Sequence, residues 1–234
     1  MAPKKNLCLS LPTINLGTNK LKNSHMNIIT INKEDPRFPN ALKAIGDDCP
    51  EKIYALGNID LLETEDTVAI IGSRQASRIG NHAAYTLGAK FAKEGKVIVS
   101  GLALGCDTAA HRGCLSVEGK TMAIVATGLN LTHPRENVPL QEEILQKGGL
   151  IISEQPLDTK ANPARLVARN RLQAALSHTV IVAECPEHSG TMHTVRFAKK
   201  YGKKVLAVHF KKENDMNSGN RYIVNQGIGD YIDF

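Results

Sequence analysis

The stretch Val68-Ala69-Ile70-Ile71-Gly72-Ser73-Arg74 decides how this chain folds. A continuous apolar run that ends at a glycine is typical of a strand buried on both faces of a parallel sheet. The residues that follow, 77–94, have the pattern of a helix. The turn between them therefore lies at the carboxyl end of a strand and the amino end of a helix. Free backbone N–H groups and the helix dipole favour an anionic ligand there.

Arg74 adds a side chain that can hold a phosphate through two parallel hydrogen bonds. Gly72 and Ser73 precede it and would shape the turn. Three residues are a short motif, and a tight turn whose arginine faces solvent is the alternative interpretation. The remaining strand ends are needed to decide between the two.

Beyond this stretch, strand-like and helix-like segments alternate regularly. Strands are predicted near 67–72, 96–100, 121–126, 149–153, 178–183 and 204–209, and helices near 78–94, 107–117, 136–147, 163–177 and 190–201. Such alternation is the signature of right-handed βαβ units and of a parallel sheet covered on both faces. We predict an α/β fold with a doubly wound, mostly parallel sheet, an extended Rossmann-like architecture with helices on both faces.

The chain divides into three predicted parts. Residues 1–26 are expected to form a basic flexible arm, which either attracts nucleic acid non-specifically or is simply a solvated tail. Residues 27–65 are a short lead-in, with strands near 28–31 and 52–56 and a helix near 40–45, expected to pack on the main domain. Residues 66–234 form the Rossmann-like core, in which 217–220 is predicted to be a turn followed by a short final segment.

Composition limits the function classes. Hydrophobic content of 42% and charged content of 22% are ordinary for a soluble globular protein. No apolar run approaches the ~20 residues that span a bilayer, and the start does not have the pattern of a signal peptide. The five cysteines are scattered without a CxxC pair, so we expect reduced thiols, no disulfide framework and no zinc site. We expect a cytoplasmic protein with no membrane contact.

The charge balance permits a polyanionic partner. Lys and Arg outnumber Asp and Glu by 29 to 23, which gives a net charge of +6. Aromatic residues are only 4% and Trp is absent, so a stacking platform for bases is poorly supplied. If this protein binds single strands, phosphate contacts must contribute most of the affinity.

Most unusual residues follow a predicted strand. The strand near 96–100 leads into Ser100, Gly101, Gly105 and Asp107, with His111 one helical turn beyond Asp107. The alternative interpretation is that Asp107 is a helix cap and His111 an ordinary helix residue. The strand near 121–126 is preceded by Lys120 and followed by Gly128.

Later strands add further candidates. Arg169, Asn170 and Arg171 lie inside an otherwise apolar helix, and because two of them are two positions apart, both arginines cannot point outward on one stripe. One of them is expected to face the ligand edge of the sheet. Glu184 follows the strand near 178–183, and Ser189-Gly190-Thr191 at a helix start is a second phosphate cradle or a capping motif.

These residues converge on one edge of one predicted sheet, and this convergence indicates an anion site. The sequence has no GxSxG, Walker A or paired-histidine metal motif, so we predict no catalytic residue, no metal and no cofactor. A glycosidic-bond hydrolase using Glu154 or Glu184 stays possible on this pattern, without being required by it.

The ordered motifs resemble the DprA/Smf family of DNA-processing proteins. They run from Gly72-Ser73-Arg74 through Ser100-Gly101-Leu102-Ala103, Thr127-Gly128-Leu129 and Arg169-Asn170-Arg171 to Ser189-Gly190-Thr191, and the similarity extends from about Asp35 to Gly227. Four stretches differ from the family pattern. Leu104 stands where a basic residue is usual, Leu166-Val167-Ala168 where an aromatic is usual, Ala126 where a glycine is usual, and His209-Phe210 where Pro-Gly is usual.

The resemblance implies a homodimeric protein that binds and protects single-stranded DNA and helps to load a RecA-type recombinase during DNA uptake or recombination. By matching position, Arg74, Lys120 and Arg169-Asn170-Arg171 would contact phosphates, and the neighbouring glycines and serines would shape the pocket. The rival is a nucleotide-binding or nucleotide-hydrolysing Rossmann protein that uses Glu184 and the Ser189-Gly190-Thr191 turn. A third reading is an interaction protein that docks a recombinase and contacts DNA only weakly.

Overall fold

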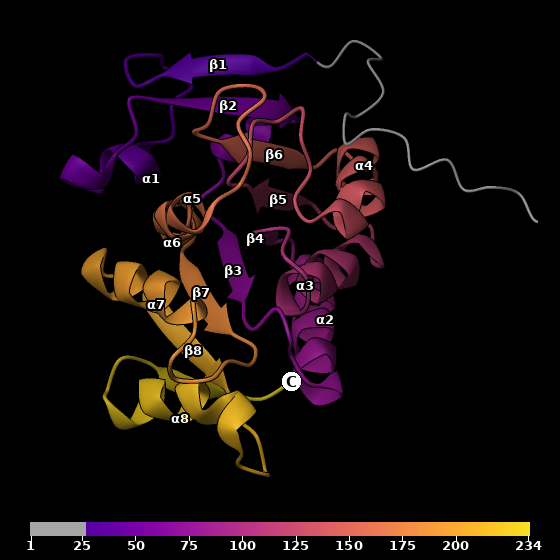
Figure 1. Ribbon diagram of the computed structural model, residues 1–234, viewed down its shortest axis with the longest axis vertical. Helices are drawn as coiled ribbons and strands as arrows, with labels where there is room; N and C mark the ends of the chain where they lie inside the picture. Colours follow the sequence, from indigo (N-terminus) through magenta and orange to yellow (C-terminus); the bar gives the residue numbers. More distant parts are fainter. Residues whose placement is uncertain (1–26) are drawn as a thin grey trace, which may run out of the picture.

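A computed structural model describes residues 27–234 of the chain. Within them, one nine-stranded sheet has the order β1-β2-β6-β5-β4-β3-β7-β8-β9 (Figure 1). All pairs from β6 to β9 across the sheet are parallel, whereas β2 pairs antiparallel with both β1 and β6. The strands are β1 Ile29–Asn32, β2 Lys52–Gly57, β3 Thr67–Ile71, β4 Val97–Ser100, β5 Thr121–Ile124, β6 Leu150–Ser153, β7 Thr179–Val182, β8 Lys204–Val208 and β9 Asp230–Ile232.

Helices cover both faces of this sheet, which confirms the predicted doubly wound Rossmann-like fold. They are α1 Asn40–Lys43, α2 Arg78–Lys93, α3 Cys106–Leu115, α4 Val138–Gln146, α5 Pro163–Ala168, α6 Asn170–Ala175, α7 Thr191–Lys200 and α8 Ser218–Asn225. Short 3₁₀ turns lie at Gly46–Asp48, Ile59–Leu62, Arg135–Asn137 and Asp215–Asn217.

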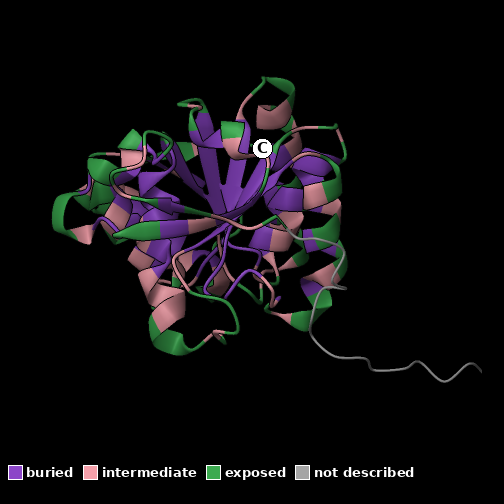
Figure 2. Cartoon of the chain, turned by 90° about the horizontal axis from the view of Figure 1, so that it is seen from above, coloured by how far each residue is buried: buried purple, intermediate pink, exposed green. Residues whose placement is uncertain are grey.

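Alternate residues of β3 belong to different hydrophobic cores. In β3, Ala69 and Ile71 pack with α6, α7 and α8 on one face, while Val68 and Ile70 pack with α2 and α3 on the other. Every residue of β3 is buried, because a central parallel strand is covered on both sides. Figure 2 shows this arrangement as buried strands between helices whose outer surfaces are exposed.

The lead-in joins the main sheet as β1 and β2 at one edge. Its residues Ile31, Phe38 and Leu42 are buried in the same core as α6 and α7. Lys200 Nζ and Tyr201 Oη each bond the carboxylate of Asp48, at 2.5 and 2.6 Å, and tie the lead-in to the end of α7. The predicted arm at 1–26 lies outside the described residues.

Two sequence expectations need correction. The helix expected over 163–177 is two helices, α5 and α6, with Arg169 at the junction between them. The expected turn at 217–220 is instead the start of helix α8. Asn214 and Asn217 form a capping box ahead of that start, and Ile223 buries the inner face of the helix. A polar stretch rich in Asn, Ser and Gly therefore caps a helix here.

Among residues 27–234, no helix combines the length and the apolar character that crossing a membrane requires.

Candidate functional site

A pocket of about 520 Å³ opens at the carboxyl edge of the sheet. It lies where the strand order reverses, because β3 is followed along the chain by β4 on one side and has β7 on the other. Ligands of open α/β sheets bind at such switch points. The pocket is lined by Ile71, Gly72, Ser73, Arg74, Gln75, Ala103, Asp107, Pro163, Leu166, Val167, Arg169, Asn170, Gln173, Ser189, Gly190, Thr191 and Thr194.

The Gly72-Ser73-Arg74 turn forms one wall of the pocket. A side chain at Gly72 would collide with the Sγ atom of Cys106, so only glycine fits between β3 and α3. Ser73 N donates to the carbonyl of Glu184 at 2.7 Å, and Ser73 Oγ accepts from Gln75 N at 3.1 Å. These bonds hold the backbone of the turn and leave Arg74 outside it.

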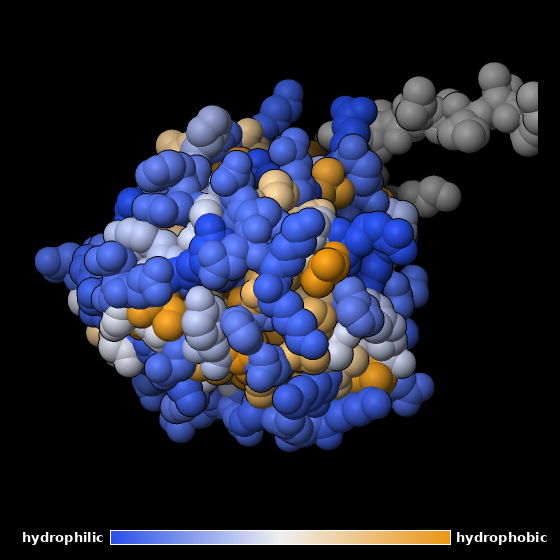
Figure 3. All heavy atoms as spheres, turned by 90° about the horizontal axis from the view of Figure 1, so that it is seen from below, coloured by the Kyte–Doolittle hydropathy of each residue, from blue (hydrophilic) through white to orange (hydrophobic). Residues whose placement is uncertain are grey.

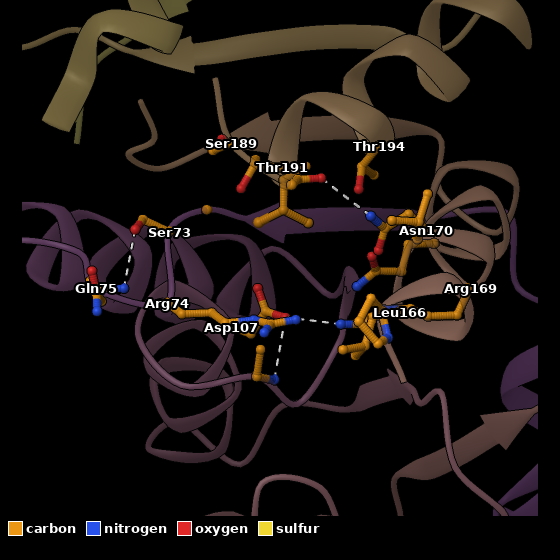
Figure 4. Close-up of a pocket in the computed structure, with 17 residues that line it drawn as sticks. Ser73, Arg74, Gln75, Asp107, Leu166, Arg169, Asn170, Ser189, Thr191 and Thr194 are labelled. Atoms are coloured by element: carbon orange, nitrogen blue, oxygen red, sulfur yellow. Dashed lines mark hydrogen bonds and ion pairs between the residues drawn. The ribbon is translucent and has the colours of Figure 1, made fainter. Parts of the chain in front are cut away.

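Arg74 is exposed at the mouth of the pocket. Within the described part of the chain it makes no hydrogen bond or ion pair, so its guanidinium is available to a ligand. Figure 4 shows Arg74 and Asp107 on one side of the pocket, with Thr191 and Thr194 across from them. An unpaired arginine beside the amino ends of α3 and α7 creates a positive potential suited to a phosphate.

Glu184 supports this turn from beneath and does not line the pocket. Its carboxylate is 1% exposed and accepts from Ser77 N at 2.6 Å and from Ser77 Oγ at 2.8 Å. Ser77 in turn caps α2 by accepting from Gly80 N. Glu184 thus fastens the end of β7 to the start of α2, and its oxygens are already committed to those bonds.

Asp107 and Arg169 form a buried pair at the base of the pocket. Asp107 Oδ2 accepts from the backbone N–H groups of Gly101 and Ala103 and lies 3.9 Å from Arg169 Nη2. Burial raises the pKa of Asp107, and the charge of Arg169 opposes that shift. Arg169 Nη1 donates to the carbonyls of Gly101 and Ile124. Arg169 therefore joins the ends of β4 and β5 to the start of α3, while its Nε has no partner in residues 27–234.

The opposite wall comes from α6 and α7. Asn170 Nδ2 donates to the carbonyl of Gly190 at 3.3 Å, which ties the start of α6 to the turn before α7. Ser189, Gly190 and Thr191 all line the pocket. Nine of the predicted site residues therefore share one pocket: Gly72, Ser73, Arg74, Asp107, Arg169, Asn170, Ser189, Gly190 and Thr191.

Four further predicted residues shape the surroundings without lining this pocket. Ser100 Oγ donates to the carbonyl of Ile70 at 2.7 Å, deep between β3 and β4. Gly101 packs directly against the guanidinium of Arg169, and Gly105, with φ of 74°, packs against the carbonyl of Ser73. Gly128 lies against the backbone of Pro156 in a separate loop.

Lys120 and His111 lie away from the predicted edge. Lys120 precedes β5, so it sits at the amino edge of the sheet, where its Nζ donates to the carbonyl of Lys147 at 2.7 Å. His111 is fully buried in α3, and its Nδ1 lies 2.7 Å from Thr121 Oγ1 at the start of β5. The placement of Lys120 corrects the expected convergence, because a residue that precedes a parallel strand cannot reach the edge at which that strand ends. His111 is held inside α3 and does not line the pocket.

The two arginines of the Arg169-Asn170-Arg171 run have opposite surroundings, as the spacing predicted. Arg171 turns away from the pocket and pairs with both oxygens of Glu154, at 2.9 and 2.6 Å. Its Nε also donates to the carbonyl of Asp48 in the lead-in. Arg169 is therefore the arginine that faces the ligand edge.

Sequence reasoning missed part of the pocket wall. Pro163, Leu166 and Val167 of α5 form an apolar side, and Gln173 and Thr194 line the pocket from α6 and α7. The sequence could have indicated two of these residues. Gln173 lies four residues after Arg169, and Thr194 lies three after Thr191, so each shares a helix face with a predicted site residue. Within residues 27–234, no three His, Cys, Asp or Glu side chains gather in a way that would hold a metal ion.

The fold and the pocket together define a Rossmann-like α/β protein with a positively charged, ligand-sized pocket at its topological switch point. Residues 28–232 match the family described as DNA recombination-mediator protein A. The chain belongs to this family.

Known relatives agree with that assignment. Protein Smf of Synechocystis is 37% identical over 178 residues, which are 75% of this chain and 44% of the relative. The X-ray structure of DNA processing protein A from Streptococcus pneumoniae matches with a TM-score of 0.80 and 33% identity, over 88% of this chain and 71% of that one.

A second solved relative is DNA processing protein A from Helicobacter pylori, in a structure described as giving insight into its single-stranded DNA binding mode. It matches with a TM-score of 0.79 and 33% identity, over 89% of this chain and 92% of that one. The chain spans about half the length of the curated relatives it matches first, 44% and 48% for the Smf proteins of Synechocystis and Escherichia coli.

Proposed function

We propose that this protein binds single-stranded DNA at the switch-point pocket and acts in DNA processing and recombination without catalysing a reaction. The observation that carries the proposal is Arg74, an exposed arginine without a partner in residues 27–234, at the mouth of a pocket that two helix amino ends also face. The Helicobacter relative, described as a single-stranded DNA binder, supports the choice of ligand. The acids nearby, Asp107 and Glu184, already hold backbone groups, which fits binding better than acid–base chemistry.

The binding is proposed to be led by phosphate contacts. Arg74 would hold one phosphate directly, and the turn before α7 would offer backbone groups to the strand. Asp107 partly offsets the charge of Arg169, so Arg74 is expected to contribute the larger share of the electrostatic attraction.

The test is equilibrium binding of a fluorescent oligonucleotide, single-stranded against duplex, at low and physiological salt. We expect single-strand-selective, salt-sensitive binding that Arg74→Ala weakens by about tenfold or more for every sequence alike, since phosphate contacts carry no base information. Arg112→Ala is the matched control, because Arg112 is an exposed arginine on α3 outside the pocket. Equal loss in both variants, or loss for one sequence only, would contradict the proposal.

A small nucleotide is the second candidate ligand. The pocket volume of about 520 Å³ lies within the ~300–1,000 Å³ of small-molecule sites. A free mononucleotide that raises the melting temperature at micromolar concentration, while oligonucleotides do not bind, would favour this candidate.

We also propose that the protein forms a homodimer and acts beside a RecA-type recombinase, which it helps to load onto the strand that it protects. The family description as a recombination mediator supports the recombinase as a partner.

The surface around β9 is the candidate dimer interface. Figure 3, which views the molecule from the side of β8, β9 and α8, shows a mostly hydrophilic face with apolar side chains between the hydrophilic ones. Tyr231 and Phe234 are 42% and 40% exposed, beside the open edge of β9. Sedimentation of the wild type and of Tyr231→Glu tests the dimer, which the variant should dissociate.

A further inference from the structure

A second, smaller hollow adjoins the pocket and shares part of its lining. Its volume is about 130 Å³, and it shares Arg74, Ala103, Leu166 and Arg169 with the pocket. Ligand pockets commonly begin at ~300 Å³, so this hollow can take a single ring but not a whole nucleotide. Because the two hollows share Arg74, one ligand can occupy both and contact this arginine between them.

The walls of the second hollow suit a flat, mostly apolar ring. Leu104, Ala126, Ala161 and Leu166 supply aliphatic surface, and Pro134 and His133 also line the hollow. Leu104 is 39% exposed, so its side chain stands at the rim, where little of the fold depends on it. A hollow lined by aliphatic side chains and an imidazole suits a planar heterocycle.

The charges around the hollow favour a neutral ring inside and an anion at its edge. Burial, together with the charges of Arg74 and Arg169, lowers the pKa of His133, and Glu136 opposes the shift. The imidazole is therefore neutral at pH 7 and offers a ring face. Arg74 and Arg169 line both hollows. Among residues 27–234, Arg74 has no partner for its donors, and the buried Nε of Arg169 has none either.

We propose that the two hollows hold two consecutive nucleotides of one strand: one in the pocket, the base of its neighbour in the second hollow, and the connecting phosphate on Arg74. This inference rests on the proposed single-strand binding and adds a base-sized subsite formed by Leu104, His133 and Leu166. The subsite contacts ring faces, so it distinguishes a strand with bases from a strand without them and accepts more than one base type.

The first test uses the wild-type protein and two 12-nucleotide strands, one of thymidines throughout and one with abasic sites at alternate positions. If both hollows take a base, the alternating strand always leaves one empty and binds about tenfold more weakly. If only the pocket takes a base, the alternating strand can still place one there. It then binds within about twofold of the full strand, because only half as many of its positions carry a base that can enter the pocket.

The second test fills the hollow with Leu104→Trp. We expect the variant to bind the full thymidine strand about tenfold more weakly than the wild type, and to bind the two strands equally. Leu157→Trp is the control, because Leu157 is 50% exposed and lines neither hollow. It should behave as the wild type does.

The results distinguish failure of the second hollow from failure of single-strand binding itself. Wild type that binds both strands alike, with Arg74→Ala still defective, would overturn the second hollow and leave the proposed function standing. Wild type that binds neither strand at low salt would overturn the proposed function and this inference with it.

Discussion

Two arginines in one pocket have opposite tasks. Arg169 is 5% exposed, bonded to two strand-end carbonyls and close to Asp107, so its guanidinium fastens the base of the pocket. Arg74 has no partner in residues 27–234 and can move onto a ligand. A change at Arg169 would therefore disturb the fold of the site, whereas a change at Arg74 removes a contact and leaves the site in place. This difference makes Arg74 the informative position for binding experiments.

The burial of His111 predicts that the fold loses stability in acid, whether or not a ligand is bound. Burial, followed by the charge of Arg169, lowers the pKa of His111 to about 3 in the folded protein, against about 6.5 when unfolded. The unfolded chain therefore binds a proton between these values that the folded chain does not bind. The neutral His111 therefore contributes its full share to the free energy of unfolding above about pH 6.5. This contribution falls with the pH, by about 2 kcal/mol between pH 7 and 5.

The measurement is urea unfolding at pH 7 and pH 5 for the wild type and His111→Asn. The asparagine amide can replace Nδ1 as the partner of Thr121 Oγ1, so the variant should fold and should lack about 2 kcal/mol of the acid-induced loss. His178→Asn, at an exposed histidine, should keep the full loss. An identical acid-induced loss in wild type and His111→Asn would show that the buried imidazole is not the group responsible.

At the scale of elements, α8 acts as a clamp on the ends of two strands. Asn220 is 1% exposed, and its Nδ2 donates to the carbonyls of Val182, Ala183 and Val208 at 3.1–3.2 Å. Its Oδ1 accepts from Cys185 N at 3.0 Å. One side chain thus joins β7 to β8 just before the chain turns toward Ser189-Gly190-Thr191.

Asn220→Ala should destabilise the fold by about 2–3 kcal/mol, because it leaves buried backbone groups at the ends of β7 and β8 without partners. Chemical denaturation measures the loss. Asn225→Ala, at the exposed end of the same helix, should change stability by less than about 0.5 kcal/mol. Matching unfolding midpoints for the two variants would mean that water satisfies those groups.

Helix α8 could not be predicted from the sequence, whereas the buried strands could. The buried parallel strands were predictable to within two residues, because β-branched and aliphatic runs ended by glycine or polar residues occur at regular spacing. Asn214, Asn217 and Gly219 favour turns as strongly as they favour helix caps, so α8 depended on tertiary contacts that the sequence does not display. The break at Arg169 was equally hidden, since no proline or glycine marks it.

The site was predictable in outline for a related reason. Residues after parallel strands must gather at one edge, so Gly72-Ser73-Arg74 and Ser189-Gly190-Thr191 were placed together correctly. Which side chains are free and which are committed was not predictable. Glu184 is bonded to Ser77, 107 residues away along the chain, and Arg171 to Glu154, 17 residues away. Only the folded structure brings these pairs together.

For the whole molecule, the net charge of +6 should affect strand binding less than the positions of the individual cations do. Lys90, on α2, is twelve residues beyond Arg78 and therefore about 18 Å farther along that helix, toward the opposite edge of the sheet. That separation exceeds the ~8 Å Debye length at physiological salt. Removing Arg74 or Lys90 lowers the net charge equally, but only Arg74 lies at the proposed path of the strand.

The salt dependence of single-strand affinity should separate these cases. Each phosphate neutralised contributes about 0.7 to the slope of log affinity against log salt. Arg74→Ala should reduce the slope by about 0.7, and Lys90→Ala should leave it unchanged. Leu104→Trp should lower the affinity with the wild-type slope, because it removes an apolar contact and no phosphate contact. Equal slopes in wild type and Arg74→Ala would place the strand elsewhere on the protein, and a reduced slope in Leu104→Trp would mean that the second hollow holds a phosphate and not a base.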